Sequence, residues 1–194
     1  MSLQSEPSRG VLSVEAGEYL ASERELLLSL AHESVLSVLE DRDFDPIPPG
    51  PHLAEPRGAF TTWHLRGRLR GCIGYVFPSD SLYKTVADTA RAAAFDDPRF
   101  SPVTAAEAPD LKAEISVLSP LQAIHPDEVI LGKHGLIVIR GSRRGLLLPQ
   151  VAIEWEWDRE TFLAQTCLKA GLPPDAWQHG AELLGFTAEV FGEQ

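Results

Sequence analysis

The chain lacks the features that would place it outside the cell or in a membrane. It has only two cysteines, Cys72 and Cys167, among 194 residues, too few for a disulfide framework, so reduced thiols and a cytoplasmic location are expected. The longest apolar stretch, around residues 145–153, is far too short to cross a bilayer. Residues 1–10 contain no apolar segment after a basic start, so no signal peptide is predicted.

An excess of positive charge is also lacking. The 17 basic and 28 acidic residues give a net charge of −11, which makes nucleic acid an unlikely partner because phosphate binding needs a basic face. The sequence has no His-x-x-x-His, Cys-x-x-Cys or clustered Asp motif, so no dedicated metal site is predicted. The phosphate-binding glycine spacings, the Gly-x-Ser-x-Gly elbow and the cysteine triad of radical-SAM enzymes are missing as well. No particular cofactor is predicted, and the sequence leaves open whether the protein is an enzyme.

What is present indicates a flexible lead-in followed by a single domain. Residues 1–18 show no sustained periodicity, whereas residues 19–194 hold enough apolar residues for one core. A helix is predicted from Ser22, with an apolar face that runs from Leu27 to Val38. The proline-rich segment Asp45–Pro51 then ends regular structure and forms a stiff connector.

Two blocks after this connector follow the same plan of hairpin, helix and strand. The first block, about residues 57–120, is predicted to contain strands, a long helix and a short helix over 58–65, 69–76, 80–97, 104–109 and 111–118. The second block, about residues 132–192, is predicted to contain strands, a helix and a helical turn over 135–139, 146–151, 158–170, 174–177 and 186–191. Ala113-Glu114-Ile115 in the first block corresponds to Ala188-Glu189-Val190 in the second.

We interpret the two blocks as an internal duplication; the alternative is a chance similarity of two common layouts. Each half exposes an apolar sheet face that it cannot cover alone, so the halves should share one sheet or one core. Strands that begin with hairpins pair antiparallel, which favours the α+β class over a doubly wound parallel sheet.

Seven segments in this order resemble the AMMECR family, also called protein A of the AmmeMemoRadiSam system. They are LRGCIG, AFDDPRF, LKAEISVL, GKHGLI, GLLLPQVA, KAGLPPDAW and AEVFG, at residues 69–74, 94–100, 111–118, 132–137, 145–152, 169–177 and 188–192. The resemblance implies a three-layer α/β/α arrangement around an antiparallel sheet built from two repeats. It also implies an association with Memo-type proteins and radical-SAM enzymes, but it carries over no established catalytic residue.

Cys72 is the first candidate for chemistry. Two glycines bracket it, Gly71 and Gly74, and such glycines mark a bulge or a close approach by another group. Positive charge from the neighbouring Arg70 would favour the reactive thiolate. The alternative is a small buried strand residue, because free cysteine is among the most buried residue types.

Glu114 and His134 are the candidate acid–base partners of Cys72. Glu114 and Ser116 share one face of their predicted strand, and the opposite face is apolar. His134 precedes the strand that begins at Gly135. For each of the two, a solvated surface position is the alternative.

Six of the 17 basic residues lie at or beside the two predicted hairpin turns: Arg66, Arg68, Arg70, Arg140, Arg143 and Arg144. Arginine binds carboxylate or phosphate through paired donors, so one or two anion-binding sites are a hypothesis for these turns. The alternative is that the hairpin tips are simply polar and exposed.

Two functions follow from these candidates. In the first, the chain is an accessory or regulatory binding module that works with a Memo-like or radical-SAM partner. In the second, it is a cysteine-dependent enzyme that acts on a small anionic substrate in a cleft near Cys72. A concave pocket around Cys72 would favour the enzyme, and a flat or buried Cys72 would favour the binding module.

Overall fold

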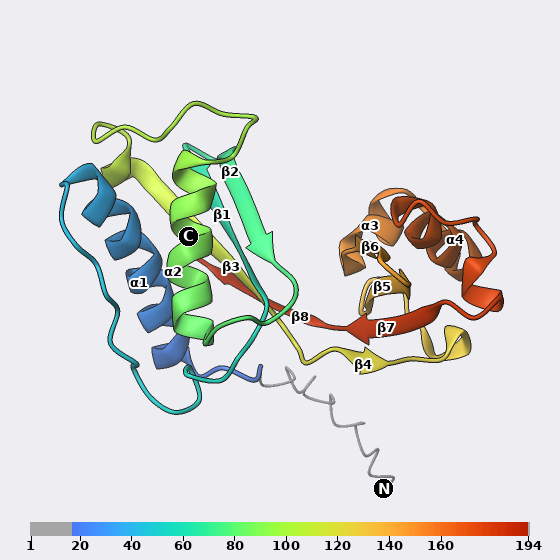
Figure 1. Cartoon of the computed structure of the whole chain (residues 1–194). Helices are drawn as coiled ribbons and strands as arrows, with labels where there is room; N and C mark the ends of the chain where they lie inside the picture. The colour runs from blue at the N-terminus through green and yellow to red at the C-terminus, as the bar shows by residue number, and fades with distance from the viewer. Residues whose placement is uncertain (1–16, 194) are drawn as a thin grey trace, which may run out of the picture.

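The computed structural model describes residues 17–193, which form two lobes (Figure 1). The first lobe contains α1 (Ala21–Leu39), β1 (Ala59–Leu65), β2 (Arg68–Tyr75), α2 (Leu82–Phe95), β3 (Leu111–Leu118) and β8 (Ala188–Gly192). The second lobe contains β4 (Gln122–Ala123), β5 (Gly135–Arg140), β6 (Arg143–Leu147), α3 (Pro149–Glu154), α4 (Arg159–Lys169) and β7 (Glu182–Phe186). Three short 3-10 helices complete the described structure: η1 (Ala108–Asp110), η2 (Pro126–Glu128) and η3 (Ala176–Gln178). Among these residues, no helix is long and apolar enough to cross a membrane.

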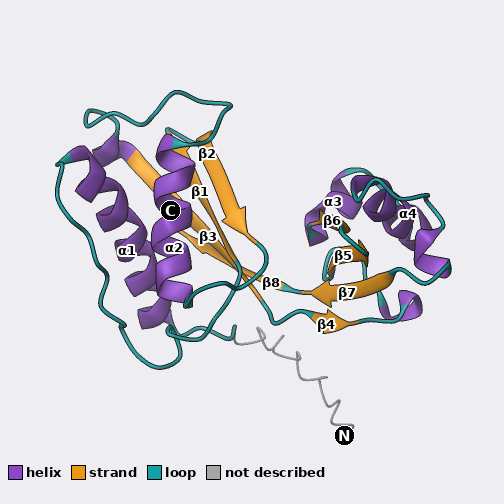
Figure 2. Cartoon of the chain, in the orientation of Figure 1, coloured by secondary structure: helices purple, strands orange, loops and turns teal. Residues whose placement is uncertain are grey.

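Each lobe is built on one four-stranded antiparallel sheet. The strand orders are β2-β1-β3-β8 in the first sheet and β4-β7-β5-β6 in the second. The fold is therefore α+β, as the hairpin-led strands predict. The strands divide into two sheets where the family resemblance implied one, because β3 and β7 each end at the junction and the chain continues into the other sheet (Figure 2).

The two sheets exchange their last strands. The unit β2-β1-β3 in the first lobe matches β6-β5-β7 in the second, and each gains a fourth strand that follows the third strand of the other unit. The counterpart of β3 is thus β7 and not the segment with Ala188-Glu189-Val190. That segment lies in β8, which pairs with β3 itself; Ser116 is opposite Val190 in the register.

In the first lobe, helices α1 and α2 cover one face of the sheet. Trp63 is fully buried on this face, and its indole Nε1 donates to the Ala90 carbonyl oxygen at 2.9 Å. Thr61 is equally buried, and its hydroxyl lies 2.8 Å from that of Thr89. Gly71 makes close packing possible, because a Cβ there would collide with the backbone carbonyl of Ala93 in α2.

Among residues 17–193, no helix covers the opposite face of the first sheet, which we call the open face. Residues opposite one another in antiparallel strands share a face, and successive residues alternate. The open face therefore carries Phe60 and Thr62 of β1. The residues in line with them on the other three strands share this face: Cys72, Gly74, Glu114, Ser116, Val190 and Gly192.

A small apolar cluster joins the two lobes. Leu118 of the first sheet is buried together with Ile137 and Phe186 of the second, and Phe60 and Val76 are among the half-buried residues that pack around them. The end of the open face nearest the junction is thus covered by the second lobe. Separate cores lie under the helices of each lobe, so the shared core that a duplication predicts is limited to this junction.

Two element predictions in the second block are wrong. The predicted strand over 146–151 ends at Leu147, because Pro149 begins α3 at the first helical position, where a missing N–H costs nothing. The predicted strand over 186–191 is two strands, β7 and β8, separated at Thr187, where the chain crosses between the sheets. The predicted start of α4 is confirmed, because the Asp158 side chain accepts a hydrogen bond from the Thr161 N–H.

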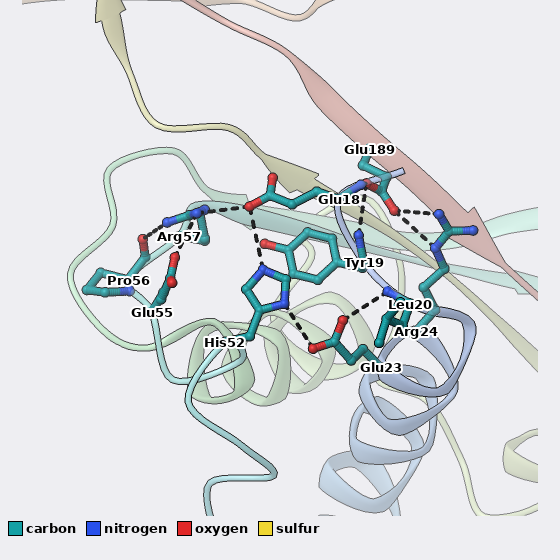
Figure 3. A network of polar contacts seen from close by, with 10 residues as sticks. All are labelled: Glu18, Tyr19, Leu20, Glu23, Arg24, His52, Glu55, Pro56, Arg57 and Glu189. Atoms are coloured by element: carbon teal, nitrogen blue, oxygen red, sulfur yellow. Dashed lines mark hydrogen bonds and ion pairs between the residues drawn. The ribbon is translucent and has the colours of Figure 1, made fainter. Parts of the chain in front are cut away.

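The segment before α1 is fixed to the first lobe by a polar network (Figure 3). Tyr19 is buried, and its ring stacks on His52 with centroids 4.9 Å apart. The Glu189 carboxylate of β8 pairs with Arg24 at 2.8 Å, and His52 pairs with Glu23 at 2.9 Å. The helix begins one residue before the predicted Ser22. Of the predicted lead-in, residues 1–16 lie outside the described residues.

Candidate functional site

Cys72 lies on the open face of the first sheet and is half-buried. Its direct neighbour on β1 is Thr62, whose hydroxyl donates to the Cys72 sulfur at 3.2 Å. Glu114 is opposite Thr62 on the other side, so the three side chains form one row across the sheet. Two strand spacings separate the Cα atoms of Cys72 and Glu114 by roughly 10 Å. The structure therefore places Cys72 and Glu114 on one surface but not in direct contact.

The main chain at Cys72 is held by the AFDDPRF segment. The Asp97 carboxylate accepts the Cys72 N–H at 2.9 Å, and the Arg99 guanidinium donates to the Cys72 carbonyl oxygen at 3.4 Å. β2 is an edge strand, so these two side chains take the place of a neighbouring strand. Asp97 is 4% exposed, and its hydrogen bonds with Arg99 hold the pKa of its carboxyl well below the usual range. The motif cysteine thus lies on a fixed backbone.

Arg70 lies at a β-bulge. The pairing of β1 with β2 shifts between Trp63 and His64, which leaves Arg70 without an opposite residue and turns its side chain inward. Its guanidinium is bound to both oxygens of Glu107, at 3.0 and 3.2 Å, and to the carbonyls of Ser101 and Pro102. Arg70 is only 9% exposed. The anion-site hypothesis needs its donors in solvent, and the structure instead uses them to attach the loop after α2.

The other five arginines do not gather into one site. Arg66 has a positive φ of 51° in the first turn and lies 3.4 Å from Asp110. At the second turn, Arg140 donates to the His179 carbonyl, and Arg143 donates to the Gly171 carbonyl at 2.9 Å. The Arg144 guanidinium stacks over Phe77 of the first lobe, 5.2 Å from the ring centroid. Arg68 is exposed. The arginines of the two hairpin turns therefore contact different parts of the protein.

His134 lies apart from Cys72, in a hollow of about 480 Å³ beside the crossing strands. Its Nδ1 accepts the Ile130 N–H at 3.2 Å, so in the neutral ring Nε2 carries the proton. Glu128, Gln122 and Thr187 are in the same wall. Neither Cys72 nor Glu114 lines this hollow, so the expected trio of Cys72, Glu114 and His134 is not assembled. Over residues 17–193, no three His, Cys, Asp or Glu side chains come close enough to hold a metal ion.

The second cysteine has a different environment. Cys167 is fully buried in α4, and this burial raises the pKa of its thiol. In the second lobe, the position of Cys72 is taken by Leu146, which lies opposite Ile137 and packs at the junction. Only the first lobe presents a thiol on its sheet face.

Comparison with known proteins decides which family this geometry represents. The family model AMMECR1 matches residues 24–191. The chain belongs to the AMMECR1 family. It is 41% identical to an uncharacterised protein from Pyrococcus horikoshii of known crystal structure, with a TM-score of 0.75 over 88% of this chain and 91% of that one.

Relatives in the AMMECR1 family include archaeal proteins of similar length. A protein of Methanosarcina acetivorans is 47% identical over 150 residues, which cover 74% of this chain and 75% of the relative. A protein of Pyrococcus furiosus is 43% identical over 186 residues, 88% of each chain. The names of these relatives state no activity, substrate or partner.

Some residues of the site were not found from the sequence. Asp97 and Arg99 lie in one of the segments that carry the resemblance to the AMMECR1 family, yet no role was predicted for them. The spacing Asp-Pro-Arg was the available signal, because a proline between an acid and a base limits the loop to few conformations. Thr62 gave no signal, since its contact with Cys72 depends on the strand register.

Proposed function

We propose that this AMMECR1-family chain is a cytoplasmic binding module that docks a Memo-like or radical-SAM protein on the open face of its first sheet. The observation that carries the proposal is that neighbouring residues of the LRGCIG segment face opposite sides of the sheet. Arg70 and Gly71 face inward, toward a loop and a helix, while the Cys72 side chain points to the open face. These residues hold a surface in place, and they do not converge on a reaction centre.

The exposed part of this surface has the composition of a docking face. Val190 is 56% exposed beside Ser116, and Glu114 is exposed beside Thr62. Such a mixture of apolar and polar groups on a rigid sheet is typical of transient protein interfaces. The class of partner follows from the resemblance to the AmmeMemoRadiSam system, and a cytoplasmic location is in accord with two unpaired cysteines.

The test is the affinity of a purified Memo-like or radical-SAM protein for this chain, measured by calorimetry. Val190→Arg on the open face should weaken binding about tenfold or more, because a charge there meets the partner. Glu25→Arg, an exposed position on α1, is the matched control and should leave the affinity unchanged. Equal affinities for both variants would contradict the proposed surface.

One observation favours the second candidate, a cysteine-dependent enzyme for a small anionic substrate. The Thr62 hydroxyl donates to the Cys72 sulfur, a contact that orients the sulfur on the open face beside a polar group. Cys72→Ser separates the two functions. It should abolish catalysis by an enzyme, whereas a docking surface should tolerate this small change with less than about a threefold loss of affinity. The alkylation rate of Cys72 should be compared with that of free glutathione, because burial alone makes Cys167 slow.

A further inference from the structure

The second lobe carries an aromatic surface that the proposed function does not use. Trp155 is 66% exposed and Leu168 is 50% exposed, and both line an apolar hollow of about 300 Å³ between α3 and α4. Single exposed apolar residues are ordinary, but several that line one hollow mark an interaction site. We call this the tryptophan surface; it consists of Leu147, Val151, Trp155, Trp157, Gln165, Leu168 and Lys169.

An unusual turn presents the two tryptophans. Helix α3 ends at Glu154, and Glu156 then takes a positive φ of 53°, a conformation that side chains other than glycine rarely adopt. The turn is closed by the Trp157 N–H, which donates to the Ala152 carbonyl at 2.9 Å. As a result, the rings of Trp155 and Trp157 lie side by side, with centroids 6.1 Å apart and planes at 21°. A residue of positive φ between the exposed ring of Trp155 and the half-buried ring of Trp157 points to a function for their placement.

The charges around the tryptophan surface are mainly negative. Glu154 and Glu156, which flank Trp155 in the chain, are exposed, and neither forms an ion pair with another described residue. Arg159, the next basic residue along the chain, donates to the backbone carbonyl of Asp127 at 2.8 Å and to the Asp127 carboxylate at 3.3 Å. Lys169 lies at the α4 end of the hollow. The Trp155 end is therefore acidic and the opposite end is basic.

We propose that the tryptophan surface binds a basic, amphipathic segment of a different protein. The face of a tryptophan ring attracts a guanidinium or ammonium group, and unpaired carboxylates strengthen that attraction. The hollow between α3 and α4 accepts the apolar side chains that follow at helical spacing. The basic residue of the segment lies over Trp155, away from Lys169. This surface is on the helical side of the second lobe and is separate from the open face of the first.

The test uses the indole N–H signals of the full chain in nuclear magnetic resonance. The probe is a peptide of roughly three helical turns, made of arginine and leucine with one apolar face. It should shift the signals of Trp155 and Trp157 and leave that of Trp63, which is fully buried and bonded to Ala90, in place. A peptide with glutamate in place of arginine should bind at least about tenfold more weakly.

Variants decide whether the named residues carry the binding. Trp155→Ala and Glu156→Gln should each weaken the arginine–leucine peptide several-fold, whereas Ile47→Ala, at an exposed position of the first lobe, should not. Equal binding of both peptides, or no effect of Trp155→Ala, would overturn the proposal. Tetramethylammonium that competes as well as the peptide would assign the site to a small cation instead. A dimer of the free chain that Trp155→Ala dissociates would assign it to self-association, and would equally overturn the proposal.

Discussion

The two lobes share one framework and differ at its edges. In both, a glycine in the second hairpin strand lets a helix approach the sheet: Gly71 meets α2 and Gly145 meets α4. One position earlier, Arg70 is buried in the first lobe, and Arg144 is exposed in the second. One position later, Cys72 is on the open face, and Leu146 packs at the junction.

This difference shows which contacts the two lobes have in common and which they do not. The packing of helix on sheet depends on small residues and is kept in both lobes, since any Cβ at these contacts collides with backbone. The polar contacts of Arg70, Asp97 and Arg99 are present only in the first lobe, where they hold the strand that carries Cys72. The first lobe thus presents a sheet face, and the second presents a helical face.

The largest expected difference in stability between variants of the two lobes is at the corresponding arginines, Arg70 and Arg144. Arg70→Met should destabilise the protein by about 3 kcal/mol, because it leaves the Glu107 carboxylate without its charged partner and the Ser101 and Pro102 carbonyls without a donor. Arg144→Met, the matched variant in the second lobe, removes a surface stacking contact and should cost less than about 1 kcal/mol. Urea unfolding measures both. Similar losses would show that the two arginines have the same role.

The ion pair of Arg70 with Glu107 should make the stability of the protein depend on pH. The hydrogen bonds of Arg70, followed by those of Thr104, lower the pKa of Glu107 to about 2 from its usual 4.5. Because the folded-state pKa is depressed, the stabilisation is complete above pH 4.5 and is lost as the pH falls toward 2. The unfolding free energy of the native protein should fall over this range, and the fall should be shallower in Arg70→Met. The same slope in both proteins would exclude Arg70 as the cause.

The shared framework can be broken at either glycine. Gly71→Ala and Gly145→Ala should each destabilise the protein by about 2 kcal/mol, because the new methyl group meets helix backbone that cannot move aside. Gly50→Ala is the control, since no atom of the described residues lies within 4 Å of a Cβ at that position. Thermal or urea unfolding of the three variants measures the effect. A Gly71→Ala protein as stable as the control would show that α2 can shift.

The hydrogen bonds from Asp97 and Arg99 to the edge strand β2 are expected to control access to the Cys72 thiol. Asp97→Asn removes the charge that pairs with Arg99 at 2.6 Å and should cost about 1.5 kcal/mol. The edge of β2 should then open more often, and Cys72 should react several-fold faster with iodoacetamide. Cys167 lies in the other lobe, so its rate should not change. Acceleration of both thiols would indicate global unfolding instead of local opening.

The smallest effect is expected at the segment before α1. A hydrogen bond with Glu23 raises the pKa of His52 above its usual 6.5. The stabilisation is therefore complete below pH 6.5 and is lost as the pH rises through the raised pKa. The pair is partly exposed, so His52→Ala should cost only about 0.5 kcal/mol at pH 6 and less at pH 8. Hydrogen exchange of residues 18–20 should report this change, and an equal cost at both pH values would contradict it.

The sequence predicted the framework better than the site. Periodicity, the Asp158 cap and the turn signals located α1, α2, α4 and both hairpins, because these depend on local interactions. The division into two sheets was not predictable, since the exchange of β4 and β8 depends on long-range pairing. The same limit applies to Arg70, which was expected to bind an anion at the surface. A bulge of one residue turns its side chain inward, where it binds Glu107 and the loop after α2. His134 was expected near Cys72, and only the topology separates them.

The most direct test of the account is protection of Cys72 by the partner. The purified chain is alkylated with iodoacetamide, alone and with a saturating Memo-like or radical-SAM protein, and the modification of Cys72 is followed by mass spectrometry. If the partner covers the open face, the rate at Cys72 should fall at least about tenfold, while the Val190→Arg variant shows little protection. An unchanged rate in a complex that demonstrably forms would place the partner elsewhere and contradict the assignment of the open face.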